Sequence, residues 1–321
     1  MTPHDEFRET LRGCLRAIDE DYRALERDGH ASTVTDRSVD FATAADTELT
    51  ETIRDYFASR PRTYRVLSEE SVTGTDTAGR ATEADAAGGR NATDVPDLTV
   101  IADEIDGTAN MLNGGDAPFG PVVAIATVGD PTFDDVAAAG FLSLQTGDLY
   151  EAYRGEGAVR TERWARDGDD SDGNDADRND AGGDILSTSG RTSVAGDDYP
   201  QLLVDQYMLS GVPDVVERCL STGYPGDFRS WIYHVALVAR GSYDLAVTGD
   251  HCELNEAKRA TAEELAAGYR LVTEAGGSVV TWEGDDLGPE RIGMAEGRTF
   301  DTVVGATGAL AREFAGRLPE G

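Results

Sequence analysis

The sequence is almost without lysine, poor in cysteine, and free of long apolar runs. Lys258 is the only lysine among the 321 residues. Lysine and arginine number 28 against 61 aspartates and glutamates, which gives a formal net charge of −33 at pH 7. Such a charge repels phosphate backbones and anionic lipids, so we expect no nucleic-acid partner and no membrane surface. An acidic, lysine-poor surface stays hydrated at high salt and predicts a halophilic, cytoplasmic protein.

The few cysteines argue against a fold held by disulfides and against a zinc site with thiolate ligands. Cys14, Cys219 and Cys252 are far apart and form no Cys-x-x-Cys pair, so we expect neither a disulfide framework nor a thiolate zinc site. Residues 1–8 are polar, and no stretch approaches about 18 apolar residues, so we expect neither export nor a membrane span.

The hydrophobic pattern mixes helical and strand-like periods, which predicts an α/β (α+β) fold. Helices are expected at residues 5–26, 45–57, 212–219, 231–239 and 262–275. Strands are expected at residues 64–67, 98–102, 121–128, 137–144, 148–153, 201–208, 244–247 and 278–282.

Two stretches have the composition of loops. Residues 73–96 hold almost no large apolar side chain, and residues 167–184 include eight aspartates. Neither can bury enough surface to offset its ordering entropy. We therefore expect an N-terminal α+β half at 1–160, an acidic disordered insertion at 161–185, and a C-terminal α/β half at 186–321.

Residues 103–108, Asp-Glu-Ile-Asp-Gly-Thr, carry the chemistry. The strand is expected to stop at Asp103, where Asp103 and Asp106 can converge with the Ile105 carbonyl between them. A cation must neutralise such a cluster, and hard oxygen donors favour Mg²⁺, with Mn²⁺ as a substitute. The backbone amides of residues 107–109, at an expected helix start, could hold a phosphate oxygen. The alternative is a solvated Asp-Gly turn.

Four motifs, in order, resemble the inositol monophosphatase family of lithium-sensitive, Mg²⁺-dependent phosphatases. Its Asp-Pro-Ile-Asp-Gly-Thr segment is similar to residues 103–108, and Asn110 also fits. Its Gly-Glu-Glu is similar to 68–70, and its Val-Asp-Leu-Val-Thr-x-Ala-Asp to 39–46. The family's Gly-Glu-x-Tyr…Gly-x-Gly-Ala hairpin is similar to residues 147–158, and its last helix is similar to residues 266–277. The resemblance covers about residues 5–310 and implies a layered αβαβα sandwich with the site between the two halves.

The resemblance also implies roles for individual residues. It implies metal binding by Glu69, Asp103, Asp106 and the Ile105 carbonyl. It implies catalytic roles for Thr108, Asp46 and Glu70, with Thr108 and Asp46 paired to orient or activate the attacking water. Gly107, Thr108 and Ala109 are the expected phosphate contacts, through the backbone amides at the helix start, and the resemblance further implies a homodimer. Two or three Mg²⁺ ions can activate water and clamp the phosphate, so no covalent intermediate is needed.

The chain departs from the family pattern at the second metal ligand. A Trp-Asp pair precedes the Ala-Ala-Gly of the family, whereas Glu263 and Glu264 stand there in this sequence. We expect Glu264 to replace the aspartate. An alternative alignment, through His251 and Cys252, assigns the ligand position to Glu253. For both Glu264 and Glu253, the alternative to metal binding is a position on a solvated helix face.

The substrate side also departs from the family, whose Gly-Ser-Ala-Ala becomes Arg229, Ser230, Trp231 and Ile232. We expect Arg229 and Ser230 to contact substrate, with Arg229 binding a second anionic group; the alternative is an arginine that pairs with nearby acids. The four histidines, at positions 4, 30, 234 and 251, are scattered and are interpreted as surface or core residues.

These patterns predict a haloarchaeal-type, Mg²⁺-dependent phosphomonoesterase that acts on a small sugar or polyol phosphate such as inositol 1-phosphate. Fructose-1,6-bisphosphatase and 3′-phosphoadenosine-type nucleotide phosphatase activities are the enzymatic alternatives. A paralogue that binds metal or phosphoester without turnover is the alternative of another class.

Overall fold

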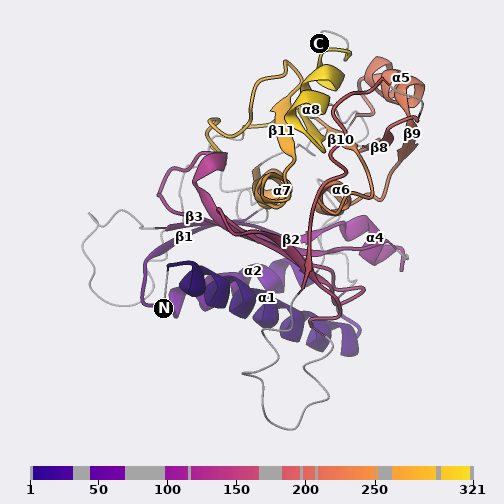
Figure 1. Cartoon of the computed structure of the whole chain (residues 1–321). Helices are drawn as coiled ribbons and strands as arrows, with labels where there is room; N and C mark the ends of the chain where they lie inside the picture. Colours follow the sequence, from indigo (N-terminus) through magenta and orange to yellow (C-terminus); the bar gives the residue numbers. More distant parts are fainter. Residues whose placement is uncertain are drawn as a thin grey trace.

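Helices and sheets alternate in layers through the molecule (Figure 1). The computed structural model describes residues 3–31, 44–68, 98–114, 117–165, 183–195, 198–206, 209–249, 251, 262–293 and 298–318. Helices α1 and α2 cover a seven-stranded sheet, α6 and α7 lie between that sheet and a five-stranded one, and α5 and α8 lie beyond the second sheet. The expected αβαβα sandwich is confirmed.

The first helical layer follows from amphipathic patterning. Leu11, Leu15 and Ile18 recur along one face of α1 and are fully buried against the sheet, as are Leu49 and Ile53 of α2. Both predicted helices are confirmed, each with slightly wider bounds. Helix α1 spans Pro3–Arg27 and α2 spans Ala44–Ala58.

The seven-stranded sheet has its strands in sequence order. Strands β1 and β2 are parallel, with Ser68 in register with Ala102, and every following pair is antiparallel. The strands are β1 Tyr64–Ser68, β2 Leu98–Asp106, β3 Gly120–Ala126, β4 Val136–Leu142, β5 Leu149–Tyr153, β6 Gly157–Thr161 and β7 Asp184–Ile185. Between them lie the short helix α4, Thr108–Leu112, and the 3-10 turn η1, Phe133–Asp135.

Strand β2 is longer than the sequence predicts, which corrects the expectation that it stops at Asp103. Pairing with β3 continues through Asp103 opposite Val122 and Asp106 opposite Gly120, with a register shift between the two pairs. The acidic residues therefore lie within the strand because its neighbour keeps supplying backbone partners.

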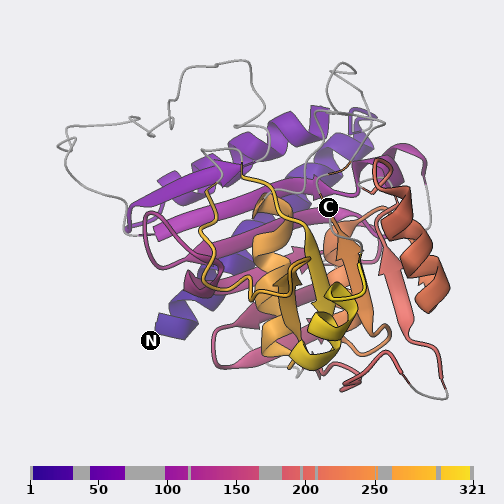
Figure 2. The ribbon, with the colours of Figure 1, turned by 90° about the horizontal axis from the view of Figure 1, so that it is seen from above.

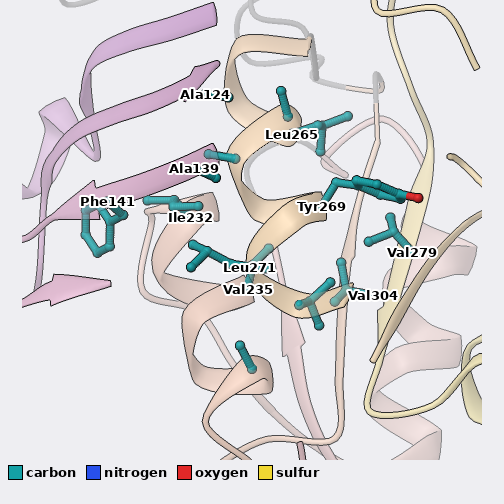
Figure 3. Close-up of a cluster of buried hydrophobic side chains, with 14 of the residues drawn as sticks. Ala124, Ala139, Phe141, Ile232, Val235, Leu265, Tyr269, Leu271, Val279 and Val304 are labelled. Atoms are coloured by element: carbon teal, nitrogen blue, oxygen red, sulfur yellow. The ribbon is translucent and has the colours of Figure 1, made fainter. Parts of the chain in front are cut away.

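Helices α6, Trp231–Ala239, and α7, Ala262–Glu274, form the layer between the sheets. Figure 3 shows side chains of α7 between Ala139 of the first sheet and Val279 and Val304 of the second. The two helices approach closely, since a Cβ on Gly268 would lie 3.2 Å from a methyl carbon of Val235. The prediction for α6 is confirmed without change.

The five-stranded sheet lies over the N-terminal half (Figure 2). Its strand order is β11-β12-β10-β8-β9. Its elements, with the two outer helices, are β8 Gln201–Val204, α5 Pro213–Thr222, β9 Tyr224–Gly226, β10 Leu245–Thr248, β11 Ser278–Thr281, β12 Thr302–Gly305 and α8 Gly308–Ala315. Strand β8 ends at Val204, well before the expected residue 208. The sequence pattern missed β9, β12 and α8.

The loop predictions lie mostly outside the described residues. Residues 73–96 and 167–182 are not described, whereas Thr161 closes β6 and Asp184 opens β7. Described residues at both ends of the expected insertion 161–185 therefore belong to strands, and the rest of the insertion stays a prediction. Cys14 and Cys219 are free and buried, and Cys252 is not described. Among the described helices, none has the length and apolar character needed to cross a bilayer.

Candidate active site

Two carboxylates near the end of β2 face the same side of the sheet although they lie three residues apart. Side chains alternate along a regular strand, so residues 103 and 106 would face opposite sides. The register shift between them is a bulge, which re-aims the side chains beyond it. Asp103 shares the side of Ile101, whose side chain packs between the sheets, and Asp106 contacts α6 on that side. Both are almost fully buried, at 3% and 7% exposure.

Asp106 lies at the N-terminus of α6. Its Oδ2 accepts hydrogen bonds from the Ser230 hydroxyl and from the backbone N–H of Ile232 at 3.2 Å. Its Oδ1 accepts from the backbone N–H of Trp231 at 3.2 Å. Ser230 is itself the N-cap, and its hydroxyl oxygen accepts from Tyr233 N–H. The carboxylate is therefore at the positive end of the helix dipole, which stabilises its charge.

Short-range hydrogen bonds shape the turn that follows. The Ile105 N–H donates to Asp103 Oδ1 at 2.9 Å, and the Thr108 hydroxyl donates to the Ile105 carbonyl at 2.9 Å. Gly107, the N-cap of α4, has φ +85°, and a Cβ there would lie 3.2 Å from Ser230 Cβ. Glycine is thus favoured both by the left-handed backbone and by the close approach of α6.

On the other side of β2, Glu104 faces helix α2. The Thr50 hydroxyl lies 2.9 Å from Glu104 Oε1 and 2.9 Å from the carbonyl oxygen of Asp46. Asp46 is buried in the first turn of α2. Thr50 therefore links the backbone of Asp46 to Glu104, on the side of β2 opposite Asp103 and Asp106. The pairing of Asp46 with Thr108 stays a prediction, because the Thr108 proton is directed at Ile105.

Asn110 and His234 hold the loop that precedes α6. Asn110 Nδ2 lies 3.1 Å from the Pro118 carbonyl and 2.7 Å from the Phe228 carbonyl. His234 is fully buried, and its Nε2 accepts from the Phe228 N–H at 2.8 Å. Burial lowers the pKa of His234 to about 3, so the ring is neutral and can accept. Sequence analysis gave neither residue a site role; the available signal was the position of His234 one helical turn after Ser230.

The family model of the inositol monophosphatase family matches residues 5–316. This chain belongs to the inositol monophosphatase family. A search of curated proteins finds no match.

Solved structures show the same fold. A Pyrococcus horikoshii hypothetical protein with similarities to inositol-1 monophosphatase is 16% identical, with TM-score 0.64 and coverage of 99% of this chain and 100% of that one. Inositol monophosphatase II of Staphylococcus aureus, bound to inositol monophosphate, is 15% identical, with TM-score 0.62 and coverage of 96% and 92%. The extragenic suppressor protein SuhB of Bartonella henselae is 17% identical, with TM-score 0.64 and coverage of 98% of each chain.

The donor chemistry of this family member fits a hard divalent cation, because Asp103, Asp106 and the Ile105 carbonyl offer only oxygen. Across the described ranges, however, no three His, Cys, Asp or Glu side chains are grouped to hold a metal. The expected carboxylates Glu69 and Glu70 lie outside the described residues. Strand β1 ends at Ser68, in register with Ala102 and so beside the start of the acidic segment.

Glu264, the expected second metal ligand, is buried. It is 8% exposed in the first turn of α7, so the alternative of a solvated helix face is wrong for this residue. Helix α7 packs on β2, and its positive N-terminal end favours carboxylates. Glu253 is not described, so the choice between Glu264 and Glu253 stays open.

The expected substrate residues lie beside this turn. Ser230 is buried on Asp106, whereas Arg229 is exposed and precedes the helix cap. The Arg229 backbone N–H donates to Asp227 Oδ1 at 2.8 Å. Burial raises the pKa of the Asp227 carboxyl, and the charge of the Arg229 guanidinium acts on that carboxylate and partly offsets the rise, so the alternative of an arginine that pairs with nearby acids stays open. Ala109 lies in the first turn of α4 with Thr108.

Proposed function

We propose that this chain is a metal-dependent phosphomonoesterase that hydrolyses a small sugar or polyol phosphate, with inositol 1-phosphate and fructose 1,6-bisphosphate as the leading candidates. Family membership supports phosphatase chemistry. The observation that carries the proposal is the convergence of Asp103 and Asp106 on one side of β2, brought about by the bulge between them.

Mg²⁺, or Mn²⁺ in its place, would supply a coordinated water of lowered pKa and positive charge against the phosphate oxygens. Asp103, Asp106 and the Ile105 carbonyl would hold it, with Glu69 and Glu264 completing the ligand set. Because the carbonyl oxygen of Ile105 has two lone pairs, its bond to Thr108 leaves it able to face a cation as well.

The remaining residues act on water and phosphate. The Thr108 hydroxyl donates its hydrogen bond to the Ile105 carbonyl oxygen, so the hydroxyl oxygen keeps lone pairs that can accept a hydrogen bond from the attacking water and orient it. Asp46 and Glu70 are the expected acid–base partners of that water. The backbone amides of Gly107, Thr108 and Ala109 are the expected donors to the phosphate.

The test is phosphate release by the purified protein in molar KCl with Mg²⁺ or Mn²⁺, against a panel of esters. The panel holds inositol 1-phosphate, fructose 1,6-bisphosphate and 3′-phosphoadenosine 5′-phosphate. Release that EDTA abolishes and Mg²⁺ restores supports the proposal. Folded protein that is silent on every ester in both metals overturns it and favours a non-catalytic, phosphoester-binding paralogue.

The setting proposed for this activity is the cytoplasm of a halophile, with a homodimer as the working form. The support for the halophilic setting is the charge of −33 and the single lysine, Lys258. The homodimer is an expectation from the family resemblance alone. We would measure activity and sedimentation at KCl concentrations from low to molar, which tests both the halophilic setting and the homodimer. A monomer with full activity at low salt would contradict them.

A further inference from the structure

His251 follows shortly after the end of β10 and is held by contacts from three separate segments. Its Nε2 lies 3.1 Å from Asp301 Oδ2, and its ring stacks on that of Trp282 with 5.0 Å between the ring centroids. Its carbonyl oxygen accepts a hydrogen bond from the Gly211 N–H at 2.6 Å. The proposed phosphatase chemistry leaves this histidine without a role. We refer to His251, Trp282 and Asp301 as the histidine cluster.

The histidine cluster lies at the end of the five-stranded sheet at which α6 begins. Trp282 directly follows β11, Asp301 directly precedes β12, and both strands end beside β10 there. Strand β8 runs parallel to β10 and so ends on the same side of the sheet. Just beyond β8, the Gln206 N–H lies 3.4 Å from Asp227 Oδ2, on the loop that leads to Ser230. The cluster therefore shares this end of the sheet with the cap that binds Asp106.

The histidine cluster nevertheless lies on the outer face of the sheet, away from the carboxylates. Trp282 belongs to the apolar core that this sheet forms with the outer helices α5 and α8. Asp103 and Asp106 instead face the layer formed by α6 and α7. The ring of His251, stacked on Trp282, is thus directed away from the expected metal site. Any effect of this ring on the reaction must pass through the backbone that it anchors.

Gly249 shows how closely the chain that leaves β10 is held against the cluster. A Cβ at this position would lie 2.6 Å from Asp301 Oδ1 and 2.9 Å from Trp282 Cζ2, so no side chain fits there unless one of them moves. These contacts fix the point at which the chain leaves β10 for α7. The connection leads to Glu264, the expected second metal ligand, in the first turn of α7.

The contacts of the cluster matter more for position than for stability. The side chains of His251 and Asp301 are 30% and 33% exposed, and an ion pair or hydrogen bond that water can reach contributes little to folding. Metal affinity, in contrast, depends steeply on where the ligands stand, and loss of a residue that orients a ligand typically costs about 10-fold or more.

We infer that His251 is a positioning residue, which anchors the start of the β10–α7 connection and thereby sets the place of the second metal ligand. This inference rests on the proposed phosphatase function and extends it to a residue that is directed away from the metal and the phosphate. Loss of the anchor weakens binding of the divalent cation and leaves the chemistry intact once the cation is bound.

The experiment measures phosphate release against Mg²⁺ concentration, and urea unfolding without Mg²⁺, for a set of variants. His251→Ala removes both side-chain contacts, His251→Phe keeps a ring to stack on Trp282, and His251→Gln keeps a donor for Asp301. His4→Ala is the matched control, because His4 is a partly exposed histidine that also lies beside a carboxylate, that of Glu156, 3.7 Å away.

We expect His251→Ala to raise the Mg²⁺ concentration for half-maximal activity by at least about fivefold, with kcat at saturating Mg²⁺ close to that of the wild type. His251→Phe and His251→Gln should each recover part of the loss. The urea midpoint should fall no further in His251→Ala than in His4→Ala.

Three results would overturn the inference. The first is an unchanged Mg²⁺ requirement in His251→Ala. The second is a kcat that saturating Mg²⁺ does not restore, because His251 would then act on the reaction itself. The third is a urea midpoint that falls further than in His4→Ala, because the effect would then be one of general stability.

The two proposals fail in different ways. If the wild type releases no phosphate from any ester, the phosphatase proposal fails, and the inference is then tested by binding of Mn²⁺ alone, followed through the electron paramagnetic resonance signal of the free ion. Binding that is at least about fivefold weaker in His251→Ala than in His4→Ala supports the positioning role. Equal binding by the two variants overturns it.

Discussion

The hydroxyl of Ser230 donates a hydrogen bond to Oδ2 of Asp106 and joins the cap of α6 to the last residue of β2. Asp106 comes from the seven-stranded sheet, and α6 packs on β10 and β12 of the five-stranded sheet. The bond therefore fixes an expected metal ligand by means of a helix from the other half. The first two predictions follow from this contact.

Asp106→Asn should reduce Mg²⁺-dependent phosphate release by on the order of 100-fold or more, because the electrostatic contribution of a metal ligand amounts to several kcal/mol. The neutral amide also cannot accept from all the donors of α6, so we expect unfolding to be easier by about 1 kcal/mol. Asp130→Asn, at an exposed carboxylate paired with Arg291, is the control. Wild-type turnover in Asp106→Asn would refute the metal-ligand role.

Ser230→Ala should lower the free energy of unfolding by about 1–2 kcal/mol through loss of the helix cap, and should weaken Mg²⁺ activation roughly 10-fold or more by releasing Asp106. Thr307→Ala is a matched control, because Thr307 caps α8 in the same way. It should cost similar stability without altering the Mg²⁺ dependence. Denaturant unfolding and Mg²⁺ titration of phosphate release measure both effects. Equal Mg²⁺ curves for the two variants would contradict the link through Asp106.

The second metal ligand can be identified by comparing Glu264→Gln with Glu253→Gln. We expect Glu264→Gln to raise the Mg²⁺ concentration needed for half-maximal activity roughly 10-fold or more, since this carboxylate is buried in the first turn of α7 and the amide that replaces it carries no charge. Glu253→Gln should behave like the wild type. The reverse pattern would assign the position to Glu253, and two unaffected variants would exclude both residues.

The buried imidazole of His234 should make the protein sensitive to acid. Its pKa in the folded state is about 3, below the ordinary value of 6.5, so below pH 6.5 protonation favours the unfolded chain. The stability of the wild type relative to His234→Gln should fall by about 1.4 kcal/mol per pH unit from 6.5 toward 3. Urea unfolding at several pH values measures this difference. His30→Gln, at an exposed histidine, should follow the wild type. A gap between wild type and His234→Gln that does not change with pH would show that folding does not lower the pKa of His234.

Local patterns predicted the helices better than the ends of the strands. The run of apolar residues after Ser230 defines α6 completely, because its cap and its buried residues are adjacent in sequence. The ends of β2 and β8 depend on partners far away in the chain. Strand β2 continues as far as β3 pairs with it, and the parallel pairing of β8 with β10 stops at Val204. No local pattern reports such partners.

At the candidate site, too, the sequence predicted features within one short segment but not contacts between distant segments. Motif spacing singled out Asp103, Asp106 and Gly107, which are close neighbours in the sequence. It did not reveal the bulge that turns both aspartates to one side, nor the contact of Thr50 with Glu104 across 54 positions. Arg229 drew notice because it replaces a small residue, but its left-handed φ became evident only from the backbone.

The contact between β2 and α6 at Asp106 also has a consequence for the order in which the contact's two sides are made during translation. The acidic turn leaves the ribosome more than a hundred residues ahead of Ser230, its partner being 124 positions later. Until that distant helix emerges, Asp106 has no dipole to offset its charge. The dipole that stabilises the charge of Asp106 is therefore supplied late in translation, after every N-terminal motif has already been made.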